Sequence, residues 1–403
     1  MNRILTESPP RHPRRRPEVV ATAVEALQEG DWARLEGAPE TEAALREFHG
    51  GGEVWFVASG TAGLEAIQLG HGIGPGDEVI TAPYTWGATV AAVLAIGAVP
   101  VFADVDPLTG LIAPESVPPL ITGRTRAILG VHLFGRPFAA RTLRKIADDA
   151  GIFLFEDGSQ AHGARLDGER VGRFGHAAAF SCMGLKPLAG TEGGYAIFED
   201  PAAAERAYLH GKHPRGLDPE RATVLAGAGL LDSLQLGWRP CAVSAALVRA
   251  GIPFLDADNA GRRENAEALR GHLADIPFVR MPPEPDATEN VFHLMSLLFD
   301  EDGAGMSREN YLKNLSALGV DAFVYIPTPL HHLARMDWRD ASLPPTFWHR
   351  QLRAVDYRSS DCPGADWRSA RAFEMAWNWM DPNPLAMEQI ARALRKAAEP
   401  LKI

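Results

Sequence analysis

Short runs of apolar residues alternate with helix-like segments through the first half of the chain. The apolar runs are EVWFVAS, DEVITAP, VPVFADV, TRAILGVHL, IFLFED, HAAAFSC and GGYAIFE, within residues 53–199. They are continuous hydrophobic stretches, which is typical of strands that are covered on both faces. The pattern therefore predicts an α/β domain with a mostly parallel sheet and helices on both faces.

The pattern changes near residue 240. Residues 244–276 predict a mainly helical stretch, with a break expected at Gly251–Pro253 because proline cannot continue the helical hydrogen bonds. Three apolar runs then follow (FVRMPP, NVFHLMSLLF and VDAFVYI), with helices between them and a last amphipathic helix at AMEQIARALRKAAEPL. Strands mixed with helices in this way predict a smaller C-terminal α+β domain.

The domain organisation follows from these patterns and from the length of 403 residues, which exceeds one ordinary domain. We expect a large α/β domain over residues 21–255 and the small α+β domain over 256–403. The beginning of the chain, MNRILTESPPRHPRRRP, is rich in arginine and proline, so residues 1–20 are expected to form an exposed, flexible arm.

Composition narrows the class of protein. Hydrophobic residues make up 46% and charged residues 23%, as in soluble globular proteins. The net charge of −11 argues against a nucleic-acid partner, and no apolar run is long enough to cross a membrane. The three cysteines, Cys182, Cys241 and Cys362, lack any metal-binding spacing, so we expect no metal site and a reducing, cytoplasmic location. Cys182 is expected to be a buried bystander.

One predicted strand leads into a helix through small residues. EVWFVAS ends at Ser59, and Gly60, Thr61 and Ala62 then open a helix. Free backbone N–H groups, the positive end of the helix dipole and the Thr61 hydroxyl would suit a phosphate there. An ordinary helix N-cap is the alternative interpretation of the same residues.

Two ionisable side chains leave neighbouring predicted strands. IFLFED ends at Asp157, and Lys186 follows HAAAFSC in a loop that holds four glycines. Pyridoxal phosphate (PLP) chemistry requires a lysine to form a Schiff base and a carboxylate to keep a pyridine nitrogen protonated. These residues predict a PLP enzyme, although a lone Asp157 is also compatible with a helix cap. Glu156 is expected on the opposite face of the strand.

Other residues nearby are weaker candidates. Gln160 is placed to donate to the phenolic oxygen of the cofactor, and the Ser181 hydroxyl to join Thr61 on its phosphate. Trp86 is placed to stack on the pyridine ring, or equally to pack in the core or an interface. His162 belongs either behind the site or in the core.

The motifs together resemble the DegT/DnrJ/EryC1/StrS family of PLP-dependent aminotransferases, over about residues 20–395. The resemblance is carried, in order, by SGTAGL, GDEVITAPYTW, VPVFADVDP, VHLFGRP, EDGSQAHGA, AFSCMGLKPLAGTEGG and TPLHHL. DCPGA and Trp377 resemble residues found in one branch of the family, which includes the inosose aminotransferases and the aminohydroxybenzoate synthases. The resemblance implies a fold-type-I enzyme with a seven-stranded sheet, acting as a homodimer in which the neighbouring subunit completes each site.

The resemblance also implies residue roles. Lys186 would form the Schiff base and Asp157 would bind the pyridine nitrogen, while Gln160 and Trp86 would contact the ring. Gly60, Thr61 and Ser181 would hold the phosphate. His331 of TPLHHL would touch substrate. In the family, one segment reaches into the partner's active site, and QLGWRP is the corresponding segment here. It keeps the arginine of that segment as Arg239, but Gly237 replaces the usual asparagine.

The reaction that the resemblance implies is transamination from glutamate or glutamine to a keto sugar or keto-cyclitol. Pyridoxamine phosphate would be the intermediate form of the cofactor. The reaction would belong to the biosynthesis of antibiotics or surface sugars. Elimination or dehydration, as in aminohydroxybenzoate synthases, is an alternative; family dehydratases carry histidine in place of the lysine. A third possibility for the function is a non-catalytic accessory subunit. Lys212, His213 and Arg215 would suit a nucleotide diphosphate, or simply form a solvated loop.

Overall fold

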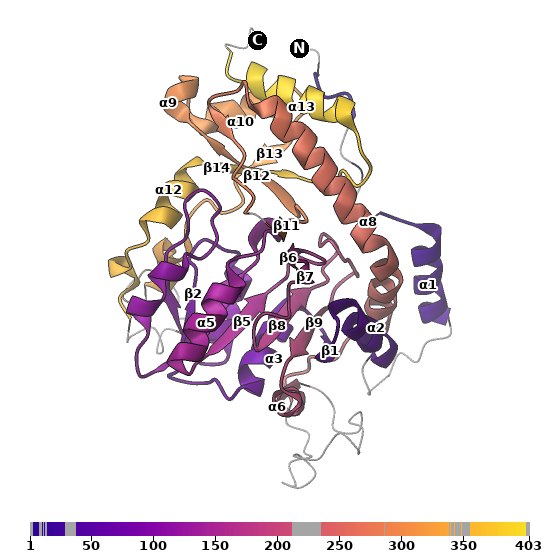
Figure 1. The fold of residues 1–403 in the computed structure, drawn as a ribbon, viewed down its shortest axis with the longest axis vertical. Coiled ribbons are helices and arrows are strands. Elements are labelled where there is room, and N and C mark those ends of the chain that lie inside the picture. The colour runs from indigo at the N-terminus through magenta and orange to yellow at the C-terminus, as the bar shows by residue number, and fades with distance from the viewer. Residues whose placement is uncertain are drawn as a thin grey trace.

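The protein is built around two sheets, described here from a computed structural model (Figure 1). The structure describes residues 3–7, 10, 12, 14–28, 38–211, 235–285, 287–337, 339, 342, 348 and 355–399. A seven-stranded sheet forms the centre of the larger part, and a four-stranded sheet forms the smaller part that holds both chain ends.

The large sheet has the order β1-β9-β8-β5-β4-β2-β3. Six strands share one direction, and β9 runs against both of its neighbours. This confirms the expected fold class and the mostly parallel sheet. The strands are β1 (Glu53–Val57), β2 (Glu78–Thr81), β3 (Val99–Phe102), β4 (Thr125–Val131), β5 (Phe153–Asp157), β8 (Ala177–Ser181) and β9 (Gly194–Phe198).

Helices cover both faces of this sheet because its strands are apolar on both sides. On one face lie α3 (Gly60–Gly70), α4 (Gly87–Ala95) and α6 (Pro201–Gly211). On the other lie α2 (Pro39–His49), α5 (Ala140–Ala150) and the first half of α8 (Ala242–Leu273). Residues such as Ile67 of α3 and Leu143 of α5 are fully buried against the strands.

The smaller part is an antiparallel sheet with its own core. Its order is β10-β12-β14-β13, from β10 (Val279–Arg280), β12 (Leu294–Phe299), β14 (Ala372–Ala376) and β13 (Ala322–Phe323). The helices are α9 (Glu301–Ala304), α10 (Arg308–Ala317), α12 (Pro363–Arg371) and α13 (Pro384–Lys396). Trp377 is fully buried there and donates its indole N–H to the Arg262 carbonyl of α8 at 3.0 Å.

The remaining elements are short. A third sheet has the order β11-β6-β7, from β11 (Thr288–Glu289), β6 (Arg165–Leu166) and β7 (Glu169–Arg170). The 3-10 turns are η1 (Pro114–Ser116), η2 (Pro118–Leu120), η3 (Leu133–Gly135), η5 (Leu330–His332), η6 (Ala334–Met336) and η7 (Tyr357–Ser359). Among the described residues, no helix has both the length and the apolar character needed to cross a membrane.

Two features differ from the sequence expectations. The break expected at Gly251–Pro253 is wrong, because α8 runs unbroken through Pro253 and continues from the large sheet to the small one (Figure 1). Its packing against α1 (Pro17–Gln28), α2 and α13 offsets the hydrogen bond that proline removes. The helix also passes through the domain boundary expected near residue 255.

The described part of the N-terminal arm is not simply exposed. Leu5 is 5% exposed and packs in the core of the small sheet. Arg16 makes a bidentate ion pair with Asp258 of α8, at 2.7 and 3.0 Å. The arm contains apolar residues among its many charged ones, and these pack in the core of the small sheet. The overall composition of the arm, rich in arginine and proline, did not reveal them.

Candidate active site

A cavity of about 570 Å³ opens at the carboxyl edge of the large sheet. The ends of parallel strands meet at this edge, so side chains far apart in the sequence converge there. The cavity gathers seven of the predicted cofactor residues, namely Gly60, Thr61, Trp86, Asp157, Gln160, Ser181 and Lys186.

Asp157 ends β5 and points into the cavity with only 4% of its surface exposed. Its Oδ2 accepts a hydrogen bond from the Thr89 hydroxyl at 2.8 Å, and its Oδ1 accepts one from the Ser159 N–H at 3.0 Å. Two donors at fixed positions hold the carboxylate in one orientation. Carboxylate oxygens have further lone pairs, so Asp157 can also accept from a protonated ring nitrogen.

Lys186 lies in the loop after β8 and is 9% exposed. Burial lowers the pKa of its amine, and the nearby Asp157 carboxylate opposes that change. A lowered pKa increases the fraction of neutral amine, which is the form that attacks an aldehyde. The backbone N–H of Lys186 donates to the Met183 carbonyl at 2.8 Å, which fixes the turn that carries the side chain.

The start of α3 and the end of β8 form the opposite end of the site. Ser59 is the N-cap of α3, and its hydroxyl accepts from the Ala62 N–H at 3.1 Å. Ala62 is therefore already bonded and does not line the cavity, whereas Gly60, Thr61 and Ser181 do. A Cβ atom at Gly60 would lie 2.6 Å from the Ser181 Cβ, so glycine is needed for this close approach.

Gln160 is held by contacts from two directions. Its Oε1 accepts from the Phe134 N–H at 2.7 Å, and its Nε2 donates to the Tyr325 hydroxyl at 3.1 Å. Phe134 has φ of 59°, which is uncommon for a residue other than glycine. The Gln160 amide is thereby fixed in one orientation, with its donor group directed to Tyr325, another residue that lines the cavity.

Trp86 precedes α4 and lines the cavity with 56% of its surface exposed. Its ring centroid lies 5.4 Å from that of Tyr325, at an interplanar angle of 31°. A tryptophan so exposed is not a core residue. Its face is available for a flat ligand or for a second protein chain.

Three further predicted residues, besides Ala62, lie outside the cavity lining. His162 is buried between Phe180 and Tyr195, and neither of its ring nitrogens has a hydrogen-bond partner among the described residues, so it belongs to the core. Arg239 is exposed, and His331 lies beside Asp366 of α12. Lys212, His213 and Arg215 fall outside the described residues.

Glu156 and Cys182 are buried as expected, and Glu156 anchors β5 from behind the site. Its carboxylate accepts from His132 Nε2 at 2.9 Å and from the backbone N–H groups of Gly172, Phe174 and Gly175. These hydrogen bonds lower the pKa of Glu156 against the effect of burial. Because His132 Nδ1 accepts from the Phe138 N–H, its Nε2 carries the hydrogen and donates it to Glu156.

Several lining residues were missed by the sequence analysis. They come from the arm, from the loop before β9 and from the small part of the protein: His12, Glu192, His293, Tyr325 and Asn378. His12 Nε2 donates to the Lys186 carbonyl at 2.6 Å. Tyr325 and Asn378 each come two residues after the end of a strand of the small sheet. This position just after a strand is the one sequence signal that could have identified them as site residues.

The chain is also similar in sequence to known proteins. The chain matches the model of the DegT/DnrJ/EryC1/StrS aminotransferase family over residues 13–347. It is 36% identical over 314 residues to the erythromycin biosynthesis sensory transduction protein EryC1 of Saccharopolyspora erythraea, covering 76% of this chain and 80% of that protein.

Two solved structures extend the likeness to almost the whole chain. One is 3-amino-5-hydroxybenzoic acid synthase, with a TM-score of 0.81, 26% identity and coverage of 97% of this chain and 98% of that one. The other is DesI, solved in the presence of its TDP-sugar product, with a TM-score of 0.76, 27% identity and coverage of 99% and 93%.

Proposed function

The chain belongs to the DegT/DnrJ/EryC1/StrS aminotransferase family and is a PLP-dependent aminotransferase, and we propose that it moves an amino group from glutamate or glutamine to a keto sugar or keto-cyclitol. The observation that carries this proposal is the buried Lys186 amine in one cavity with the fixed Asp157 carboxylate. The likeness to DesI supports a sugar acceptor, either free or linked to a nucleotide.

The residues of the cavity fit the cofactor. The lysine has a lowered pKa, the carboxylate has unused lone pairs, and the start of α3 offers small residues next to Ser181. When bound, PLP would supply an aldehyde for the lysine and a ring that accepts electrons from the substrate carbon. Lys186, Asp157 and Gln160 would hold the reactive end, and Gly60, Thr61 and Ser181 the phosphate.

Each side chain then has a defined task. Lys186 would take a proton from the substrate carbon that bears the nitrogen and release it to the carbon on the other side of that nitrogen, which requires that its amine be neutral at the start. Asp157 would hold its negative charge toward the ring nitrogen, and the hydrogen bond from Thr89 keeps the carboxylate from turning away. Trp86, which lines the cavity, would cover the ring on one side.

The acceptor side of the cavity is mixed in character. Glu192, His293 and Asn378 offer polar groups, while Phe323 and Leu294 offer apolar surface. A polyhydroxylated ring has polar edges and apolar faces, so a sugar or cyclitol matches such a wall. We propose antibiotic or surface-sugar biosynthesis as the setting, in the cytoplasm, with a homodimer that places Arg239 at the partner's site.

An elimination or dehydration reaction is the second candidate, and the likeness to 3-amino-5-hydroxybenzoic acid synthase supports it. The same lysine and carboxylate would serve, because both reactions begin with removal of a proton from the substrate carbon. The two candidates differ in whether nitrogen is transferred from the amino donor to the product.

The test is a panel of keto sugars and keto-cyclitols, free and nucleotide-linked, incubated with the enzyme and ¹⁵N-labelled glutamate or glutamine. Incorporation of ¹⁵N into one acceptor, abolished in Lys186→Ala, would support the proposal. Loss of water without ¹⁵N incorporation would favour the second candidate. A purified protein that is colourless and unchanged by amino donors would favour the accessory subunit.

A further inference from the structure

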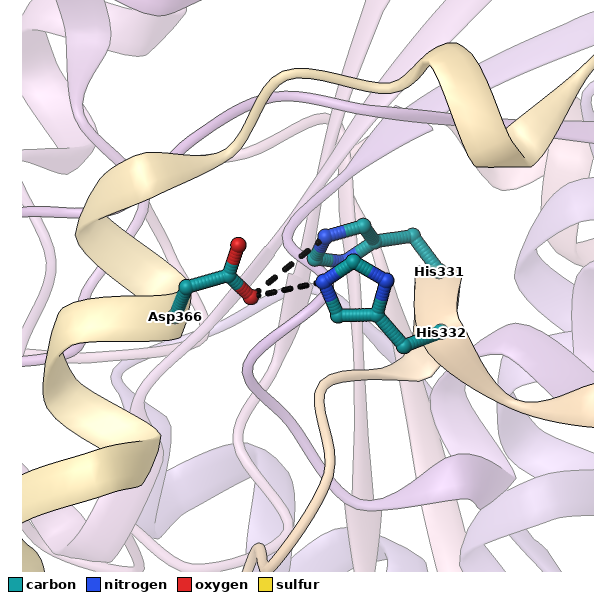
Figure 2. Close-up of side chains that lie close together, drawn as sticks. All are labelled: His331, His332 and Asp366. Atoms are coloured by element: carbon teal, nitrogen blue, oxygen red, sulfur yellow. Dashed lines mark hydrogen bonds and ion pairs between the residues drawn. The ribbon is translucent and has the colours of Figure 1, made fainter.

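Two histidines and an aspartate meet at a place that is separate from the active-site cavity (Figure 2). His331 and His332 are consecutive residues of the turn η5, and Asp366 lies in the first turn of α12. Both imidazoles lie on the same side of the turn, with ring centroids 3.8 Å apart, and each directs a nitrogen toward the Asp366 carboxylate.

The distances suit a shared ligand between these groups. His332 Nε2 lies 2.9 Å and His331 Nε2 lies 3.6 Å from the same oxygen, Asp366 Oδ1. One potential ligand atom from each of the three residues lies within 4.8 Å of the other two. In a tetrahedral zinc site with bonds of about 2.1 Å, neighbouring ligand atoms are roughly 3.4 Å apart.

The strongest sign of a ligand site is His331 itself. Its side chain is fully buried, yet neither ring nitrogen has a hydrogen-bond partner among the described residues. A buried polar group without a hydrogen-bond partner destabilises the folded protein.

The large part of the protein holds both segments in place. The N–H of Leu330 donates to the Pro83 carbonyl at 2.9 Å, in the loop after β2. Asp104, after β3, accepts from the N–H groups of Gly364 and Ala365 at 2.8 and 3.0 Å and so fixes the start of α12. The three side chains are thus carried by backbone that is already anchored, and the carboxylates of Asp104 and Asp366 favour a cation there.

We infer that His331, His332 and Asp366 bind one divalent cation of the zinc class, with a fourth position open to solvent. Two imidazoles and one carboxylate are a ligand set that zinc accepts. About half of the His332 and Asp366 side chains remains exposed (46% and 47%), so the ion has a path into the site. The ion would tie η5 to α12 and give one His331 nitrogen the partner that it lacks.

The experiment measures zinc binding by the holoenzyme after treatment with a chelator. Cys241 is an exposed thiol that also attracts zinc, so Cys241→Ser is the background for every variant. The test variants are His332→Gln and Asp366→Asn, which remove one ligand from an exposed side chain and spare the buried ring. The matched control is His272→Ala, which removes an exposed histidine near the end of α8.

The background protein is expected to retain about one zinc ion per chain after gel filtration, measured by mass spectrometry of the metal, and to melt at a higher temperature with zinc than without. Each test variant should weaken zinc binding at least tenfold and lose the thermal shift, while His272→Ala keeps both. Two results would overturn the inference: no retained zinc in the background protein, or test variants that bind zinc as tightly as the control.

Discussion

Replacing Asp157 with asparagine separates the charge of this residue from its shape. The asparagine oxygen can still accept from the Ser159 N–H, and the Thr89 hydroxyl can turn and accept from the new amide. Both native contacts therefore have a substitute in Asp157→Asn. We expect the variant to fold as well as the parent and to lose only the negative charge that faces the ring nitrogen of the cofactor.

The size of the effect follows from the burial of the carboxylate, which is 4% exposed. Two opposite charges about 4 Å apart interact by about 4 kcal/mol at an effective dielectric constant of 20. Loss of that interaction would lower the pKa of the ring nitrogen by about three units. If half to all of this energy is expressed in the transition state, the proton-transfer step slows by about 30- to 1,000-fold.

The assay is rapid mixing of the PLP-loaded enzyme with the amino donor, followed by the change in cofactor absorbance during this first half of the reaction. Thermal melting of the same samples reports whether the fold is kept. A rate within threefold of the parent, with an unchanged melting temperature, would refute the role given to the charge. A large fall in melting temperature would refute the claim that asparagine preserves the contacts.

Further predictions concern the cofactor, the support of β5 and pH. Gly60→Ala should weaken PLP binding at least tenfold, because the new Cβ has no room, whereas Gly87→Ala has nothing within 4 Å and should bind normally; equal titration curves would contradict this. His132→Leu leaves the buried Glu156 with one donor fewer and should lower the free energy of unfolding by about 2–4 kcal/mol in urea titrations, whereas a loss under 1 kcal/mol would contradict its anchoring role. Since burial lowers the Lys186 pKa, recapture of PLP by the apoenzyme should accelerate with rising pH and level off below the ordinary lysine value of about 10.4. Between this lowered pKa and about 10.4, the unfolded chain binds more protons than the folded chain, so the stability of the apoenzyme should rise with pH across that window. A recapture rate that levels off only above about 10.4 would contradict the shift.

Much of the fold and of the cofactor end of the site could be predicted from the sequence. Parallel strands bring their carboxyl ends to one edge, so Asp157 and Lys186 could be expected together once their strands were recognised. The direction of β9 could not be predicted, because its apolar run has the same pattern as its parallel neighbours. The unbroken α8 could not be predicted either, since its stability across Pro253 depends on helices from distant parts of the sequence.

The substrate side was harder to predict for a physical reason. Tyr325 and His12 reach the cavity from the small sheet and from the N-terminal arm, and their places depend on how these parts dock. Local hydrophobic periodicity contains no information on docking. The cluster of His331, His332 and Asp366 was missed in the same way, because 33 residues separate the second histidine from the aspartate in the sequence.

The proposed function rests on the covalent attachment of PLP to one lysine. The measurement is reduction of the yellow holoenzyme with borohydride, followed by proteolysis and mass mapping of the pyridoxyl group. We predict that the label is found on the peptide containing Lys186 and is absent from the Lys186→Ala variant. A label on another lysine, or an unlabelled peptide from an active preparation, would contradict the proposed site.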